Sequence, residues 1–191
     1  GVENIPHDEI LSYDEILKVC KCASKLGIKK IKITGGEPLV RKDIVSLIRD
    51  IKNIRGIEQV TLTTNGVLLY DMAKDLYEAG IDAINVSLDT LSRKKFLKIT
   101  RRDDFEKVSM AIDKLIDLGV RVKINCLAIK EYNFDEIVKI AQYSKDNNID
   151  VRFIELMPIG YGKIYTGISN EVILGLLEEK YGDRKSTRLN S

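Results

Sequence analysis

The chain has 191 residues, 44% of them hydrophobic, which is enough to bury a sizeable core in one domain. Its net charge is +2, so the composition gives no reason to expect nucleic acid or an anionic membrane as a partner. Because no apolar run approaches the roughly 20 residues needed to cross a bilayer, and no signal peptide is visible, we expect a soluble, cytoplasmic protein.

Helical patterns alternate with strand-like runs along the chain. Ser12 and Glu15 are spaced as a capping box, so the first helix is expected over residues 13–25. Apolar residues at helical spacing predict further helices over residues 43–54, 71–79, 105–118, 134–144 and 171–181. The expected order is a helix followed by five strand–helix units.

One phrase recurs around each predicted strand. It consists of Gly or Asn, then Ile or Val, then an apolar-rich run: LGIKKIKIT from Leu26, RGIEQVTLTT from Arg55, AGIDAINVSL from Ala79, LGVRVKINC from Leu118 and NNIDVRFIE from Asn147. The Gly or Asn is typical of a helix that ends in the left-handed conformation. The Ile and Val content of the runs predicts strands that are buried on both faces.

Strands and helices that alternate at this spacing indicate parallel strands joined by crossover helices. Two architectures remain open from the residues alone, an open doubly wound sheet and a complete or partial barrel, and in both the ligands lie at the carboxyl ends of the strands. Small or polar clusters stand at these ends: Gly35 to Pro38, Thr63 to Gly66, Ser87 to Asp89, Asn125, and Glu155 to Pro158. Their shared rim favours a ligand site over unrelated turns.

The segment Thr34-Gly35-Gly36-Glu37-Pro38 has the chemistry of a cation site. Two glycines let the backbone approach a ligand and expose its carbonyl oxygens, and the carboxylate of Glu37 adds negative charge. Pro38 is expected to fix the exit into the next helix. A phosphate loop is excluded because the Lys-Ser/Thr ending is absent. The alternative is a plain turn with a solvated Glu37.

Two lysines interrupt the apolar runs. Lys32 and Lys123 each stand between two branched apolar residues. A charge in a buried strand is costly unless it is paired, so these residues favour an anion-binding interior. The alternative is that each lysine lies near an exposed end of its strand.

The cysteines and the histidine do not predict a metal site. The chain has three cysteines, Cys20, Cys22 and Cys126, and one histidine, His7, which is too few for a zinc set. Cys20 and Cys22 point to different faces of the predicted helix. We therefore expect no metal ligands in this chain.

Four segments carry a family resemblance. ITGGEPLVRKD, TTNG, INVSLD and RFIELMPIG resemble, in order and approximate spacing, the radical S-adenosylmethionine enzymes, and more closely the GTP 3′,8-cyclase family. The likeness runs from Ile10 to about Tyr181. It implies an α/β fold, a partial (β/α) TIM-like barrel of about five parallel strands over residues 1–183.

The resemblance also implies roles for particular residues. The segment Gly35, Gly36 and Glu37 would receive the amino group of S-adenosylmethionine. Ser87 would hold its carboxylate, Asn125 its ribose and the Met157 region its adenine. The GTP-binding positions would be Lys32, Thr63 and Lys123, facing the barrel interior. The family commonly has Arg where this chain has Lys32, and lysine loses the bidentate fork of arginine.

The activity that the resemblance implies is the first step of molybdopterin synthesis. S-adenosylmethionine is cleaved at a [4Fe–4S] cluster, the radical takes the 3′ hydrogen of GTP, and the ribose radical attacks C8 of guanine. An electron donor is required, and a homodimer is a further expectation. Two alternatives are another radical S-adenosylmethionine enzyme with a different substrate, and a non-catalytic nucleotide-binding α/β module.

The family's cluster loop, Cys-x-x-x-Cys-x-x-Cys, is not in this chain, and neither is its C-terminal region with a second cluster. We therefore expect a fragment whose [4Fe–4S] ligands lie outside the chain and which is inactive alone. Residues 184–191 lack apolar periodicity, and we expect a non-native or disordered tail there.

Overall fold

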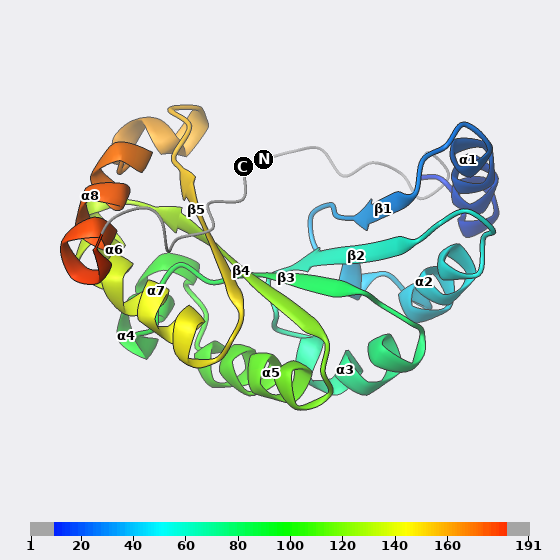
Figure 1. Cartoon of the computed structure of the whole chain (residues 1–191), viewed down its shortest axis with the longest axis horizontal. Helices are drawn as coiled ribbons and strands as arrows, with labels where there is room; N and C mark the ends of the chain where they lie inside the picture. Colours follow the sequence, from blue (N-terminus) through cyan, green and yellow to red (C-terminus); the bar gives the residue numbers. More distant parts are fainter. Residues whose placement is uncertain (1–9, 183–191) are drawn as a thin grey trace.

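The computed structural model describes residues 10–182, and within them it does not describe the side chain of Tyr161. His7 and the tail expected at 184–191 lie outside these residues. One parallel sheet runs through the described part (Figure 1), with its strands in the order β1-β2-β3-β4-β5. Their bounds are Lys30–Ile33, Gln59–Thr64, Ala83–Ser87, Arg121–Ala128 and Asp150–Glu155. Because the order never reverses, the sheet is a partial barrel and not a doubly wound sheet.

The described residues form eight α-helices, two more than the six helices that the sequence predicts. They are α1 Tyr13–Lys25, α2 Ile44–Lys52, α3 Leu69–Glu78, α4 Arg93–Thr100, α5 Phe105–Asp117, α6 Lys130–Asn133, α7 Ile137–Asp146 and α8 Asn170–Tyr181. Three short 3-10 helices are η2 Pro38–Val40, η3 Phe134–Glu136 and η4 Gly160–Ile164. None of the helices within residues 10–182 is long and apolar enough to span a membrane.

Some local predictions are confirmed and some are wrong. The capping box is present, because the Ser12 N–H donates to Glu15 and the Glu15 N–H donates to the Ser12 hydroxyl. The helix over 93–100 was not predicted, since only Phe96 of its residues is buried and the apolar period is weak. The helix predicted over 134–144 is divided between η3 and α7.

The residues before the strands have the expected backbone conformation. Gly27, Gly56, Gly80 and Gly119 have φ angles of 90°, 95°, 82° and 73°, and Asn148 has a φ of 51°. This left-handed conformation ends each helix and turns the chain into the next strand.

The three central strands are buried on one face only and the edge strands β1 and β5 have no fully buried residue, which corrects the expectation of burial on both faces. Helices α2, α3, α5 and α7 lie along the convex side of the curved sheet, and the concave side carries no helix (Figure 1). In β4 the residues Val122, Ile124 and Cys126 are fully or almost fully buried, whereas the alternate residues are half-buried or exposed. A partial barrel leaves its inner face open, so the positions that face inward can be polar.

Candidate functional site

Polar side chains gather on the concave face of the sheet. Thr63 on β2 is in register with Asn85 on β3, Asn85 with Lys123 on β4, and Lys123 with Asp150 on β5. Residues paired directly across parallel strands project from the same face, so these four side chains form one line, which we call the central row. The fold therefore builds a continuous polar strip from residues that are far apart in the sequence.

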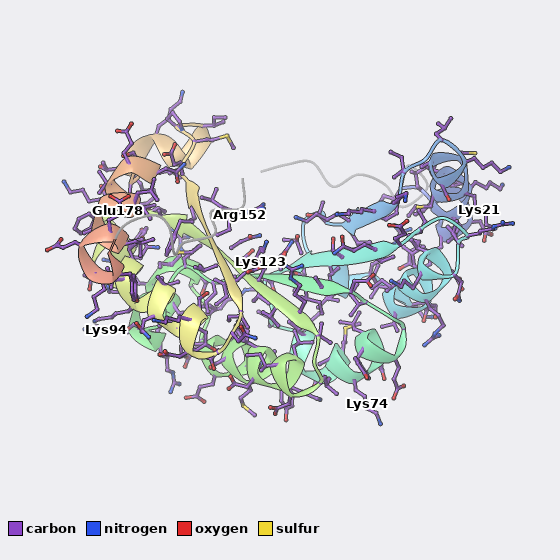
Figure 2. The ribbon with its side chains drawn as sticks, viewed as in Figure 1. Lys21, Lys74, Lys94, Lys123, Arg152 and Glu178 are labelled. Atoms are coloured by element: carbon purple, nitrogen blue, oxygen red, sulfur yellow. The ribbon has the colours of Figure 1, made fainter. Side chains whose placement is uncertain are left out.

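The central row contains one hydrogen bond and one ion pair, one in each half of the row. The Asn85 amide nitrogen donates to the Thr63 hydroxyl over 3.3 Å. The Lys123 ammonium lies 3.4 Å from the Asp150 carboxylate, which is also 3.1 Å from the Arg121 guanidinium. Lys123 is thus a paired charge with a side chain 20% exposed, which explains how a lysine stands in the middle of the sheet. Its ammonium points to the concave side (Figure 2).

A second line, the rim row, lies closer to the carboxyl ends of the strands. Ser87 is in register with Asn125, and Asn125 with Arg152. Asn125 was expected at the end of its strand, but β4 continues to Ala128, because the longer strand extends past the end of β3. The side-chain amide oxygen of Asn125, Oδ1, is buried and has no hydrogen-bond donor within the described residues. An unsatisfied buried acceptor is rare and marks a place for a donor from a ligand or water.

Arg152 was missed by the sequence reasoning. It is exposed, points to the concave side (Figure 2), and forms no ion pair within residues 10–182. The signal was available, because Arg152 stands between Val151 and Phe153 as Lys123 stands between its apolar neighbours. Together with Lys123 it makes this part of the concave face attractive to anions.

The glycine segment after β1 borders open space. A Cβ added at Gly35 or Gly36 would meet no atom within 4 Å. Gly36 also has no positive φ, so neither the backbone nor the packing of the chain requires glycine there. The missing side chain leaves room for a group from outside the chain to approach the backbone.

Glu37 is already held by the chain. Its carboxylate accepts hydrogen bonds from the Thr64 hydroxyl at 2.7 Å, the Asn65 N–H at 2.7 Å and the Leu39 N–H at 3.1 Å. The segment after β1 is thereby fixed to the end of β2. Pro38 begins the short helix η2 and not the next α-helix, which starts at Ile44, so its predicted role as a direct helix start is wrong.

The remaining predicted residues lie at the two edges of the sheet. Lys32, on edge strand β1, is exposed and in register with Thr61, so it shares the concave face but stands one level below the central row. Met157 follows β5 at the other edge and is 70% exposed. No hydrogen bond or ion pair within the described residues joins either of them to the other predicted residues.

Hydrogen bonds from Leu127 and Asn133 to Asp89 hold the loop that follows β3. The Asp89 carboxylate accepts the Leu127 N–H at 2.8 Å, and the Asp89 carbonyl accepts the Asn133 amide at 2.7 Å. Asn133 is fully buried and was missed, because nothing in the sequence distinguishes it from a surface Asn. Burial raises the pKa of the Asp89 carboxyl, and the hydrogen bond from Leu127 only partly opposes this.

We expect Asp89→Asn to stabilise the protein at neutral pH. Since the folded-state pKa of Asp89 is raised above 3.8, the ionised carboxylate is disfavoured in the fold, and stability falls as the pH rises through that raised pKa. Asn keeps the oxygen that accepts from Leu127 but carries no charge. Thermal unfolding should show a higher melting temperature for the variant at pH 7 and a smaller difference at pH 4. A loss of equal size at both pH values would contradict this, and the exposed Asp75→Asn is the control.

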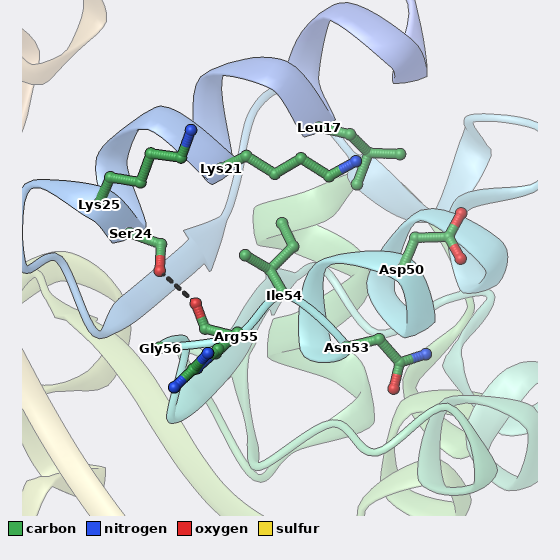
Figure 3. Close-up of a pocket in the computed structure, with 9 residues that line it drawn as sticks. All are labelled: Leu17, Lys21, Ser24, Lys25, Asp50, Asn53, Ile54, Arg55 and Gly56. Atoms are coloured by element: carbon green, nitrogen blue, oxygen red, sulfur yellow. Dashed lines mark hydrogen bonds between the residues drawn. The ribbon is translucent and has the colours of Figure 1, made fainter.

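One hollow lies away from the concave face. It measures about 860 Å³ and lies between α1 and α2 (Figure 3), lined by Leu17, Lys21, Ser24, Lys25, Asp50, Asn53, Ile54, Arg55 and Gly56. Within it, the Ser24 hydroxyl donates to the Arg55 carbonyl at 2.6 Å, which joins the two segments. Its polar side chains are on exposed helix surfaces, so it lacks the convergent buried groups of a ligand site.

The described residues contain no group of His, Cys, Asp and Glu side chains that could hold a metal ion. Cys20 and Cys126 are buried and Cys22 is exposed, and all three are free thiols. Burial raises the pKa of the Cys126 thiol, which keeps it protonated. The cysteines of the described part are therefore packing or surface residues.

Comparison with known proteins identifies related sequences. Residues 3–144 match the family model of the radical SAM superfamily. The chain is 46% identical over 189 residues to a GTP 3′,8-cyclase of Clostridium perfringens and 48% identical over 186 residues to one of Thermodesulfovibrio yellowstonii. These alignments cover 97% and 95% of this chain, and 58% of each relative. The chain thus spans little more than half the length of the curated relatives it matches.

Solved structures share the fold at low sequence identity. The crystal structure of Streptococcus suis SuiB bound to S-adenosylmethionine is similar with a TM-score of 0.72 at 20% identity, over 93% of this chain and 43% of that one. Methylornithine synthase has a TM-score of 0.63 at 19% identity, over 75% of this chain and 44% of that one. Both support the partial barrel architecture.

Proposed function

Because the chain belongs to the radical SAM superfamily, we propose that it is a segment of a GTP 3′,8-cyclase, with residues 1–183 as its partial barrel. The identity of 46% and 48% to two enzymes of that name supports this particular activity within the superfamily. The concave face of the sheet, with a polar and cationic lining, is the surface on which we place both ligands.

S-adenosylmethionine fits the rim of the sheet. The open space beside Gly35 and Gly36 accommodates the methionine amino group, whose hydrogens the backbone carbonyls accept. Glu37 orients this segment and adds negative charge nearby. Ser87 is exposed at the end of β3 and can donate to the methionine carboxylate. The observation that carries this assignment is the orphaned Asn125 oxygen, which lies beside Ser87 and lacks a donor that a ribose hydroxyl would supply.

Met157 completes this set. Its exposed thioether follows β5, at the height of the rim, where the adenine of the cofactor would meet an apolar surface. With a [4Fe–4S] cluster as the electron source, S-adenosylmethionine held by these residues would supply radical chemistry. The residues of this chain bind and orient the molecules that take part in the reaction and keep them apart from water.

GTP fits the central row, one level below the rim row. Lys123 on β4 provides positive charge for the phosphates, the Thr63 hydroxyl provides a further hydrogen bond, and Lys32 on edge strand β1 adds positive charge at the opposite side of the site. Arg152, one level above Lys123, adds a guanidinium that can hold an oxyanion with two parallel hydrogen bonds. The phosphates would therefore lie near β4 and β5. We further propose a cytoplasmic enzyme that receives electrons from a donor protein and assembles as a homodimer.

The cyclase proposal can be tested with labelled substrate. A protein that contains this chain together with the cluster-binding segments is incubated with GTP deuterated at the 3′ carbon, S-adenosylmethionine and a reductant. One deuterium in the 5′-deoxyadenosine and a cyclised nucleotide are expected. Deuterium-free 5′-deoxyadenosine with no change in GTP would indicate a radical SAM enzyme with another substrate. Absence of S-adenosylmethionine binding would indicate a non-catalytic nucleotide-binding module.

We expect Gly36→Ala to weaken S-adenosylmethionine binding without destabilising the fold. The added methyl group meets no atom of the chain, so the free energy of unfolding should change by less than about 1 kcal/mol. It fills the space beside the backbone, so the affinity measured by calorimetry should fall roughly tenfold or more. Gly175→Ala is the matched control, because a Cβ there also meets nothing. Equal affinity of both variants would contradict the assignment.

A further inference from the structure

Asn85 occupies the centre of the central row but has no role in the assignments above. It stands directly between Thr63 and Lys123, which are in register with it on either side. Its neighbours in β3, Ile84 and Val86, are fully buried against the helices, so Asn85 itself faces the concave side. Any ligand that contacts both Thr63 and Lys123 must pass over its side chain.

The hydrogen bond that Asn85 makes determines which polar groups of Asn85 and Thr63 remain available to a ligand. Its amide nitrogen donates to the Thr63 oxygen at 3.3 Å, so the Thr63 hydroxyl hydrogen is free to donate outward. Asn85 is a half-buried residue, and no residue of the described part donates a hydrogen bond to its side-chain amide oxygen, Oδ1. An amide oxygen accepts only, so what it binds must be a donor.

Among the groups of GTP, this requirement selects the ribose. Phosphates carry acceptor oxygens only at neutral pH, and they belong beside Lys123. The donors of GTP are the ribose hydroxyls and the N–H groups of guanine. Asn85 lies one strand step of about 4.8 Å from Lys123, and the group next to the phosphates along the nucleotide is the ribose.

We propose that Asn85 is a specificity-determining residue whose side-chain amide oxygen accepts a hydrogen bond from a ribose hydroxyl of GTP. It distinguishes a ribonucleotide from a deoxynucleotide at a step where the ribose itself reacts. A site built to accept from a hydroxyl loses binding when either partner is removed, because the remaining polar group is left unpaired. The inference rests on the proposed GTP site and adds that the site recognises a ribose hydroxyl of the nucleotide.

The test is a double-mutant cycle between protein and ligand. Wild-type chain and Asn85→Ala are titrated calorimetrically with GTP, 2′-deoxy-GTP, 3′-deoxy-GTP and inosine triphosphate. Asn85→Ala should bind GTP about tenfold more weakly than the wild type does. One of the two deoxy nucleotides should bind both proteins with the weakened affinity, because the contact is already absent. The affinity for inosine triphosphate should fall by the same factor as the affinity for GTP when Asn85 is replaced by Ala.

Two controls separate folding from recognition. The affinity of Asn85→Ala for S-adenosylmethionine should stay within about twofold of the wild type, which shows that the sheet is intact. If the alanine variant does not fold, Asn85→Val, a branched strand residue without an acceptor, takes its place. Gln59→Ala removes an amide from the other end of the same sheet face and should leave GTP affinity unchanged.

Each outcome has a definite meaning. Wild-type affinity of Asn85→Ala for GTP would overturn the inference, and so would equal losses with all four nucleotides. The inference would also be overturned if the loss caused by Asn85→Ala disappeared with inosine triphosphate but persisted with both deoxy nucleotides. Asn85 would then contact the guanine base and not the ribose. If the wild type binds no GTP, or Lys123→Ala binds it unchanged, the proposed function fails as well.

Discussion

Lys123→Ala is expected to reduce GTP affinity roughly a hundredfold, which corresponds to about 2.7 kcal/mol. The ammonium is the only lysine charge in the central row, and its side chain is 20% exposed, so its attraction for a phosphate is only weakly screened. Asp150 remains paired with Arg121 at 3.1 Å after the substitution, so the fold should lose little stability. The measurement is calorimetric titration at two salt concentrations.

The matched control for this variant is Lys74→Ala. It removes the same charge from the convex side (Figure 2), where Lys74 forms a weak 3.7 Å pair with Glu78. GTP affinity should be unchanged, because a charge behind the sheet is screened from the ligand. Lys123→Met keeps the apolar stem and should bind GTP as poorly as Lys123→Ala. Equal losses in Lys74→Ala and Lys123→Ala would mean that only net charge matters and that no local phosphate contact exists.

Glu37→Ala is expected to impair both stability and cofactor binding. Three donors lose their acceptor, and one of them, the Thr64 hydroxyl, belongs to a residue only 2% exposed. Hydrogen bonds to a charged group contribute roughly 1.5–3 kcal/mol each in buried settings, so a loss of about 3 kcal/mol in unfolding free energy is expected for the set. The glycine segment is then no longer fixed to β2, and S-adenosylmethionine affinity should fall about a hundredfold.

Glu37→Gln is expected to lose only part of the hydrogen bonding that Glu37→Ala removes. Its remaining oxygen can still accept from Thr64 and Leu39, while its amide group faces the Asn65 N–H and leaves two donors opposed. The loss of stability should therefore be smaller than in Glu37→Ala. Glu58→Ala removes an exposed 2.7 Å pair with Lys29 and should cost less than about 1 kcal/mol. Urea denaturation measures all three variants, and a stable Glu37→Ala that binds the cofactor normally would contradict the role assigned to Glu37.

The parallel α/β architecture could be read from the sequence because its signals are local. A Gly or Asn with left-handed geometry precedes each strand, and the helical period of apolar residues is set by the need to cover one side of a sheet. Where a helix buries little, as in α4, the period is weak and the prediction failed. Where a segment changes from a 3-10 to an α-helix, as between Phe134 and Asp146, the boundaries were wrong.

The site was predicted in part for the same reason. Gly36, Lys123 and Asn125 stand out because their residue types contradict the strand or turn around them. Arg152 and Asn85 carried the same signal, since each stands between two apolar residues of its strand, but Asn133 did not, because an asparagine is unremarkable there. The importance of Asn85 and Asn133 depends on what lies beside them, which is Thr63 for Asn85 and the Asp89 carbonyl for Asn133.

The sequence by itself determined the order of strands and helices, the rim on which polar groups collect and the family resemblance. Only the tertiary structure decided that the sheet is a partial barrel with one open face, because strand order depends on which strands pair. It also decided which residues are neighbours across that face. Register is set by contacts between strands that lie tens of residues apart, and no local pattern contains it. The rows of Thr63, Asn85, Lys123 and Asp150, and of Ser87, Asn125 and Arg152, exist only once the strands are aligned.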